Sequence, residues 1–141
     1  MAEAVGPPLR WAVVVVRLDR PDEAEAPSER RAIVVSYEAF HRSGQLTVCP
    51  ITAARATPRY PGEVAIPIGE AGQTKDGLIL CAQARTVSIG RVRLTGILPG
   101  GGIAYLSDPR IRAAVRAALR HHLGLDIPPL SDGAAAPAGR L

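Results

Sequence analysis

Aromatic residues and long apolar runs are both scarce in this sequence. Phe, Trp and Tyr make up 4% of the 141 residues, so few side chains are available to stack on nucleic-acid bases. No apolar run, that of Ala12 to Val16 included, is long enough to cross a bilayer, and no basic segment precedes an apolar stretch of secretory length. We therefore expect a cytoplasmic protein without membrane contact.

Cysteine is also rare. Cys49 and Cys81 each sit within an apolar run, and two isolated cysteines lack the paired spacing of a zinc site. In a cytosolic protein, such residues are usually buried, reduced thiols. We expect both to belong to the core, and we expect no metal and no cofactor.

Lysine is almost absent, since Lys75 is the only lysine among 17 basic residues. With 13 acidic residues the net charge is +4, which favours an acidic partner such as RNA or an acidic polypeptide. The arginine bias is also what a GC-rich genome produces, so composition leaves both explanations open. The hydrophobic content of 47% is sufficient for the core of one domain.

Short β-branched or alternating runs separated by turn residues predict a mainly β domain over residues 10–125. The segments 1–9 and 126–141, rich in Ala, Pro and Gly, are predicted to be flexible tails. Asp19 to Arg31 reads as a long mobile loop, and Pro67 predicts an edge strand. The expected strands are Trp11 to Leu18, Ala32 to Val35, Leu46 to Ile51, Val64 to Ile68, Leu78 to Cys81, and Arg85 to Leu98 as one bent or two short strands.

One amphipathic helix is predicted from Ser107 to Leu123, with Ser107 as its N-cap and Gly124 after its end. Its apolar stripe consists of Ile111, Val115, Ala118, Leu119 and His122, and His121 is expected on the surface. Opposite that stripe, Arg112, Arg116 and Arg120 recur every four residues. They form either a solvated helix face or a ridge that faces RNA.

Several short motifs occur in the order that characterises one protein family. They are Arg17-Leu18-Asp19, Arg30-Arg31-Ala32-Ile33-Val34-Val35-Ser36, Phe40 to Gly44, Pro50-Ile51-Thr52, Arg59-Tyr60-Pro61 with Glu63-Val64, Gln83 with Arg85-Thr86-Val87, and Leu106-Ser107-Asp108 with Leu119, His122, Leu123, Gly124 and Leu125. The sequence from about residue 11 to residue 125 thereby resembles the MazF/PemK family of type II toxin-antitoxin systems. The collinear order makes the match specific, although each motif alone is weak.

The resemblance implies a fold and an activity. The fold would be a small SH3-like antiparallel β-barrel of the MazF/CcdB type with a C-terminal helix. The activity would be metal-independent cleavage of single-stranded mRNA through a 2′,3′-cyclic phosphate. The family also implies a homodimer restrained by a cognate antitoxin protein with an acidic segment.

Arg30 and Thr52 are the leading candidates for catalysis by this resemblance. The guanidinium fork of Arg30 suits two phosphate oxygens, whereas the alternative is a surface salt bridge to Glu25 or Glu29. The Thr52 hydroxyl suits a phosphate contact, whereas the alternative is a cap on its own backbone.

His41 and Glu25 are weaker candidates for proton transfer, because each lies in a predicted loop or turn. An imidazole can act as base or acid at neutral pH, and some family members place an acidic residue near the active arginine. The candidate RNA-binding residues are Arg55, Arg59, Tyr60 and Arg85. Tyr60 either stacks on a base or packs under Pro61.

Three positions depart from the family pattern. Trp11-Ala12 replaces the usual Gly-Asp pair, Arg31 replaces a proline, and Ala82 replaces an acidic residue. The last change favours an alternative function, a catalytically weakened barrel that serves as a binding or regulatory module. A third hypothesis is a gyrase-inhibiting toxin of the same fold, against which Arg30 and Thr52 argue.

Overall fold

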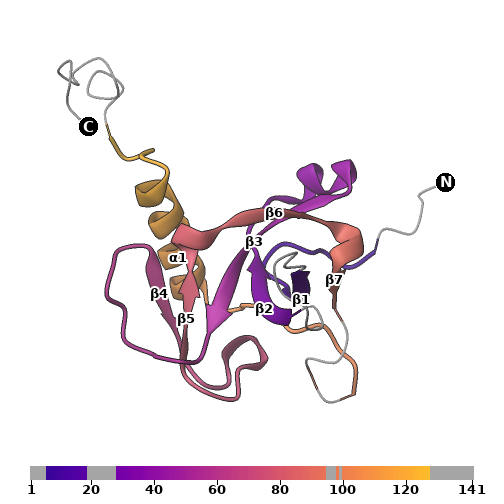
Figure 1. Ribbon diagram of the computed structural model, residues 1–141, viewed down its shortest axis with the longest axis horizontal. Coiled ribbons are helices and arrows are strands. Elements are labelled where there is room, and N and C mark those ends of the chain that lie inside the picture. Colours follow the sequence, from indigo (N-terminus) through magenta and orange to yellow (C-terminus); the bar gives the residue numbers. More distant parts are fainter. Residues whose placement is uncertain (1–5, 19–27, 95–97, 99, 128–141) are drawn as a thin grey trace.

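Strands dominate the computed structural model, which describes residues 6–18, 28–94, 98 and 100–127 (Figure 1). The strands are β1 (Val13–Leu18), β2 (Ser28–Val34), β3 (Gln45–Thr52), β4 (Glu63–Ile66), β5 (Gly77–Leu80), β6 (Arg85–Ser88) and β7 (Val92–Arg93). The 3-10 helices are η1 (Glu38–Ser43), η2 (Glu70–Gly72), η3 (Cys81–Gln83) and η4 (Ile89–Arg91), and the α-helix is α1 (Pro109–His122). The predicted succession of short strands before a single helix is confirmed.

The strands form one antiparallel sheet in the order β4-β5-β3-β2-β1-β7, with β6 also paired to β3. One edge of β3 pairs with β2, and its other edge pairs first with β6 and then, at its last two residues, with β5. β4 is an edge strand, as predicted, but it ends at Ile66, before Pro67, rather than at Ile68. Closure into a barrel is not found among the described residues, because β7 has two residues and β4 packs on α1 instead.

The second strand is longer than the sequence predicted. β2 begins at Ser28 rather than Ala32, so Arg30 and Arg31 lie in a strand and not in the expected loop. β1 explains the difference, because it pairs with β2 along its whole length and satisfies the backbone groups of this polar segment. Asp19 to Pro27, the rest of the expected loop, lies outside the described residues.

Alternating side chains build an apolar cluster on each face of the sheet. One cluster includes Val13, Ile33, Cys49 and Val115, and the other includes Val14, Ala32, Leu46 and Val48. The first cluster is covered by α1. The second is packed by residues of β6 and of the segment that follows it, among them Val87, Ile89, Val92 and Leu94.

The cysteines occupy the core as predicted. Cys49 and Cys81 are both free and fully buried in the cluster under α1. A hydrogen bond with Cys81 and burial both raise the pKa of the Cys49 thiol far above its ordinary value. The Cys49 thiol therefore stays protonated at neutral pH, and both cysteine side chains act as packing groups.

The helix begins later than predicted. Asp108, not Ser107, is its N-cap, and the Asp108 carboxylate accepts the Arg110 N–H at 2.8 Å. Ser107 instead donates its N–H (2.9 Å) and its hydroxyl (3.2 Å) to the Glu70 carboxylate. Among the described residues, no helix combines the length and apolar character that crossing a bilayer requires.

The apolar stripe of α1 is confirmed except at its end. Val115 and Ala118 are buried, and Ile111 and Leu119 pack against the same cluster. His122 is exposed, although we expected it to pack. It is the last residue of α1, and this end of the helix projects past the sheet (Figure 1).

The described part of the predicted N-terminal tail, residues 6–9, contacts the domain. The carbonyl oxygen of Pro8 accepts the Tyr105 hydroxyl at 2.6 Å, and the Leu9 N–H donates to the Glu38 carboxylate. These bonds place residues 8 and 9 against η1 and the segment before α1. The boundaries of the two tails, residues 1–9 and 126–141, stay predictions.

The loop between β3 and β4 is pinned by one carboxylate. Glu63 accepts two hydrogen bonds from the Arg55 guanidinium and one, at 2.8 Å, from the Arg59 N–H. The Glu63 side chain is only 7% exposed. The Arg55 bonds in particular hold the pKa of Glu63 at about 2, below its ordinary value of 4.5.

We predict that this carboxylate contributes to stability above pH 4.5 and that the contribution is lost as the pH falls toward 2, because the unfolded chain takes up the proton first. Urea unfolding between neutral pH and pH 2.5 measures the effect. Glu63→Gln should flatten the acid limb of the profile, and Glu29→Gln, which removes an exposed ion pair, is the control. An unchanged acid limb in Glu63→Gln would contradict this explanation.

Candidate functional site

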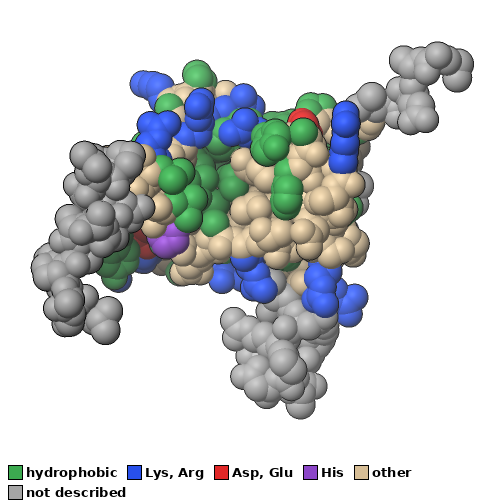
Figure 2. Space-filling view, turned by 90° about the horizontal axis from the view of Figure 1, so that it is seen from above, with side chains coloured by type: hydrophobic (Ala, Val, Ile, Leu, Met, Phe, Trp, Pro, Cys, Tyr) green, Lys and Arg blue, Asp and Glu red, His purple; other side chains and the backbone are tan. Residues whose placement is uncertain are grey.

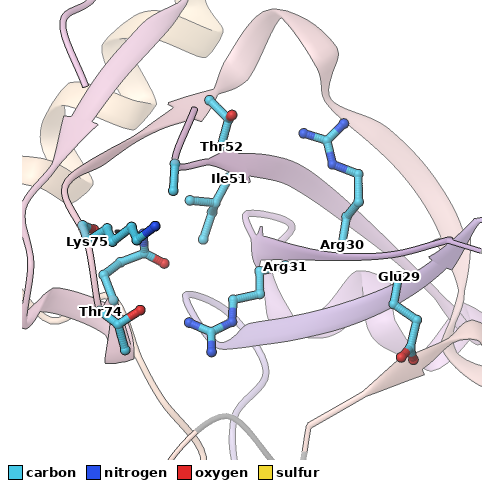
Figure 3. A pocket seen from close by; sticks show the side chains of 9 residues that line it. Glu29, Arg30, Arg31, Ile51, Thr52, Thr74 and Lys75 are labelled. Carbon is cyan, nitrogen blue, oxygen red and sulfur yellow. Dashed lines mark hydrogen bonds between the residues drawn. The ribbon is translucent and has the colours of Figure 1, made fainter. Parts of the chain in front are cut away.

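A cavity of about 390 Å³ opens where β2 begins and β3 ends (Figure 3). The segment before β5 forms its third wall. The lining residues are Glu29, Arg30, Arg31, Ile51, Thr52, Ala53, Gln73, Thr74 and Lys75. Two of the predicted site residues, Arg30 and Thr52, therefore meet in one cavity, although 21 positions of sequence separate them.

Strand register explains why these two side chains meet. β2 and β3 pair Ala32 with Pro50, and continuing that register by two residues sets Arg30 opposite Thr52. Side chains alternate along a strand, so both lie on the face that also carries Ala32. In Figure 3 the side chains of Arg30 and Thr52 point the same way, and Arg31 points the opposite way.

Thr52 is held rigidly. Its backbone pairs with Leu78 of β5, and a Cβ on Gly77 would overlap the Thr52 carbonyl oxygen, so β5 approaches as closely as glycine allows. The Thr52 Oγ1 accepts the N–H of Ala54 at 3.2 Å, which is the backbone cap considered above. That bond uses a lone pair, so the hydroxyl hydrogen is still available to donate.

Positive charge prevails in the cavity. Arg30, Arg31 and Lys75 face one carboxylate, Glu29, which forms an ion pair with Arg93 at 3.4 Å. Among the described residues, none bonds to the Arg30 guanidinium, and the expected alternative of a bridge to Glu29 is not found. Glu25, the other expected partner, lies outside the described residues. The cavity is thus suited to an anion.

Arg31 connects the cavity to the segment before β5. Its Nη1 donates to the carbonyl oxygen of Gly72 at 3.3 Å. The neighbouring Gln73 is a buried polar residue, 7% exposed, whose amide donates to the Lys75 carbonyl at 3.4 Å. These bonds fix the turn that carries Thr74 and Lys75.

His41 does not line this cavity. It lies in η1, where Nε2 contacts the Ser36 hydroxyl at 2.7 Å and Nδ1 contacts the Glu38 carboxylate at 3.2 Å. Ser36 also accepts the Thr47 N–H at 2.9 Å. The imidazole thus links η1 to Ser36, which follows β2 and in turn bonds to β3, and it is separate from Arg30 and Thr52.

The predicted RNA-binding residues also lie outside the cavity lining. Arg59 and Arg85 are exposed, and Tyr60 is 63% exposed, so it does not pack under Pro61. Arg55 is engaged by Glu63. Arg59 and Tyr60 follow Thr52 in the chain on the loop that Glu63 pins.

Sequence reasoning missed Arg31, Gln73, Thr74 and Lys75. The one available signal was Lys75, the only lysine, in a Lys-Asp-Gly turn. Ala82 lies in η3, is exposed and does not line the cavity. In the part of the chain that is described, no three His, Cys, Asp or Glu side chains are placed to hold a metal ion.

Solved structures show the same fold. A chain of the MazE-MazF complex of Deinococcus radiodurans matches with a TM-score of 0.63 at 24% identity, covering 84% of this chain and 96% of the other. A mycobacterial endoribonuclease in complex with its cognate antitoxin gives 0.60 at 21% identity, over 86% and 100%. The Mycobacterium tuberculosis toxin MazF-mt6 gives 0.60 at 16% identity, over 82% and 98%.

No single curated protein matches the chain significantly. A protein-family model does match it and agrees with the structural comparison. The family model for the PemK-like, MazF-like toxin of type II toxin-antitoxin systems matches residues 9–123. That range contains both Arg30 and Thr52, together with every described strand and the helix. The chain therefore belongs to the family of PemK-like, MazF-like toxins of type II toxin-antitoxin systems.

Proposed function

We propose that this chain is a toxin that cleaves single-stranded RNA without a metal ion, using the cavity of Arg30 and Thr52. The observation that carries the proposal is the position of the Arg30 guanidinium. No carboxylate of the described residues bonds to it, and it lies on the same face of the sheet as the fixed hydroxyl of Thr52. Membership of a toxin family and the fold shared with a mycobacterial endoribonuclease support it. Lys75 adds positive charge from the opposite wall.

The proposed reaction uses the nucleophile that RNA itself carries. The 2′-oxygen forms a bond to the adjacent phosphorus, and the bond from phosphorus to the 5′-oxygen breaks. The products end in a 2′,3′-cyclic phosphate and a 5′-hydroxyl. Arg30 holds two nonbridging phosphate oxygens with its fork, and Thr52 donates a hydrogen bond to the charge that develops on the phosphorane.

RNA outside the cavity would lie along the loop that follows β3. Arg59 offers a phosphate contact there, and the exposed ring of Tyr60 offers a stacking surface for one base. Arg85 on β6 is a further phosphate contact. Arg55 orders this loop through Glu63 and contributes to RNA binding by positioning it.

We also propose an antitoxin partner, a homodimer and a cytoplasmic location. The relatives from Deinococcus radiodurans and from a mycobacterial species are described in complexes with MazE and with a cognate antitoxin. Figure 2 shows a face on which hydrophobic side chains form a central patch with Lys and Arg side chains around it. Such a patch suits a partner with apolar and acidic side chains.

Replacing Arg30 by Ala should reduce the cleavage rate by about a hundredfold or more, because a preorganised donor to a charged transition state is lost. Arg30→Lys should stay slow, since it keeps the charge but lacks the fork. Cleavage of one defined RNA under single-turnover conditions measures both rates. Arg110→Ala removes a highly exposed arginine on α1 and is the control. A fully active Arg30→Ala chain would reject the site.

Proton transfer is the part of the mechanism for which the cavity offers no described group. His41 lies elsewhere, and Glu25 lies outside the described residues. Ala82 supplies a methyl group where the family typically has a carboxylate. This favours the second candidate function, a MazF-like domain of weakened activity retained for binding, and it predicts a slow natural enzyme.

Ala82→Asp tests that explanation. The family pattern predicts that restoring a carboxylate raises cleavage by about a hundredfold or more, the usual contribution of a positioned acid or base, and this requires bound RNA to extend from the cavity to η3. Position 82 is exposed, so folding should be nearly unchanged, which thermal melting checks. In Ala82→Asn the asparagine has nearly the same shape as aspartate but transfers no proton, so cleavage by this variant should stay slow. His41→Ala should leave the rate unchanged.

A natural chain that is already fast, with Ala82→Asp neutral, would show that an acidic residue at this position is dispensable. Equal acceleration by Ala82→Asp and Ala82→Asn would show that the gain does not come from proton transfer. A slow His41→Ala chain would assign the imidazole a role that its position does not indicate.

A further inference from the structure

A second basic pocket lies where the segment before β1 meets the first turns of α1. It measures about 240 Å³ and is lined by Arg10, Trp11, Pro109, Arg112, Ala113 and Arg116. Three of its lining residues are arginines, and two of these come from successive turns of one helix face. None of them belongs to the cavity of Arg30 and Thr52.

The backbone of Trp11 is fixed in an unfavourable conformation. Its φ is +71°, in the left-handed region that favours glycine and that bulky residues rarely adopt. Two hydrogen bonds hold it there, from the Trp11 N–H to the Val34 carbonyl (2.7 Å) and from the Leu106 N–H to the Trp11 carbonyl (2.8 Å). The indole is therefore held in one place, with 8% of the residue exposed.

This indole is a platform for two guanidinium groups. The Cζ atoms of Arg10 and Arg112 lie 5.2 Å and 5.5 Å from the ring centroid, within the range of cation–π attraction. Arg112 is further oriented by its Nε, which donates to the Leu106 carbonyl at 2.5 Å. The ring thus offsets part of the repulsion that would separate the two like charges.

The positive charge of this pocket has no counter-charge in the part of the chain that is described. No carboxylate of those residues forms an ion pair with Arg10, Arg112 or Arg116. The Arg10 Nε is buried and has no hydrogen-bond acceptor. A buried donor without an acceptor is costly, and an incoming anion would compensate the charge around it.

We propose that this pocket binds a phosphate group. Three guanidiniums around one small cavity match an ion with more than one negative charge and several acceptor oxygens better than a single carboxylate. The group could come from free phosphate or from the backbone of a nucleic acid. The indole is buried, so a base would not stack on it.

The phosphate pocket is separate from the proposed catalytic cavity. Trp11 bonds to Val34 at one end of β2, whereas Arg30 pairs with Val16 toward the other end. Trp11 also belongs to the core cluster under α1, whereas Arg30 shares its face with Ala32 of the opposite cluster. The pocket therefore does not depend on nuclease activity and is testable without it.

Trp11 is the only tryptophan of the chain, so its fluorescence reports on this pocket alone. The fluorescence is followed at constant ionic strength in two titrations, one with inorganic phosphate and one with a single-stranded DNA oligonucleotide. DNA is used because it lacks the 2′-hydroxyl and is not cleaved. Saturation by inorganic phosphate would identify free phosphate as a source, and saturation by the oligonucleotide alone would identify the backbone. Either result supports the pocket.

Variants decide whether the arginines hold the ligand. Arg116→Gln should weaken binding about tenfold, because one charge-assisted contact is lost, and it leaves the fold intact since Arg116 is exposed. Arg10→Gln should weaken it as well, and Arg110→Gln, an equal charge change on the exposed side of α1, should not. The proposal would be overturned by no saturable response, by equal weakening in Arg110→Gln, or by tighter binding of a polyglutamate peptide.

Discussion

The antiparallel pairing of β2 with β1 and β3 is the constraint on which the rest of the structure depends. It extends a strand through Ser28 and Arg30 and sets the face on which each side chain lies. It brings Arg30 opposite Thr52, although the two residues are far apart in the sequence. A shift of one residue would turn Arg30 toward the opposite cluster and would remove it from Thr52.

Arginine has two different roles on this small domain. Where a carboxylate faces it, as Glu63 faces Arg55, it orders a loop and lowers the pKa of its partner. Where no carboxylate of the described residues forms an ion pair with it, as at Arg30 and around Trp11, positive charge is held in place by backbone and ring contacts. Preorganised, uncompensated charge is what phosphate recognition needs, since the protein does not have to reorganise when the ligand arrives.

Local patterns predicted most elements, and distant contacts decided the rest. The valine run of β1, the stripe of α1 and the pairing of Arg30 with Thr52 in one site followed from periodicity or from the family motifs. The start of β2 could not be predicted, because its polar residues are typical of a loop and only β1 makes them a strand. Ser107 and Asp108 are both good N-cap residues. Ser107 hydrogen-bonds to Glu70, which is distant in sequence, and Asp108 is the residue that caps the helix. Lys75 reaches the cavity through a Lys-Asp-Gly turn, and no local pattern specified that this turn would lie beside β2 and β3.

The most direct test of the account is the chemistry of the RNA ends. One defined single-stranded RNA is incubated with the purified natural chain in excess EDTA, with long sampling times, and the product termini are identified by mass spectrometry. We predict cleavage that chelation does not prevent, with 2′,3′-cyclic phosphate and 5′-hydroxyl ends. Products with 3′-hydroxyl and 5′-phosphate ends, or cleavage that stops on chelation, would contradict it.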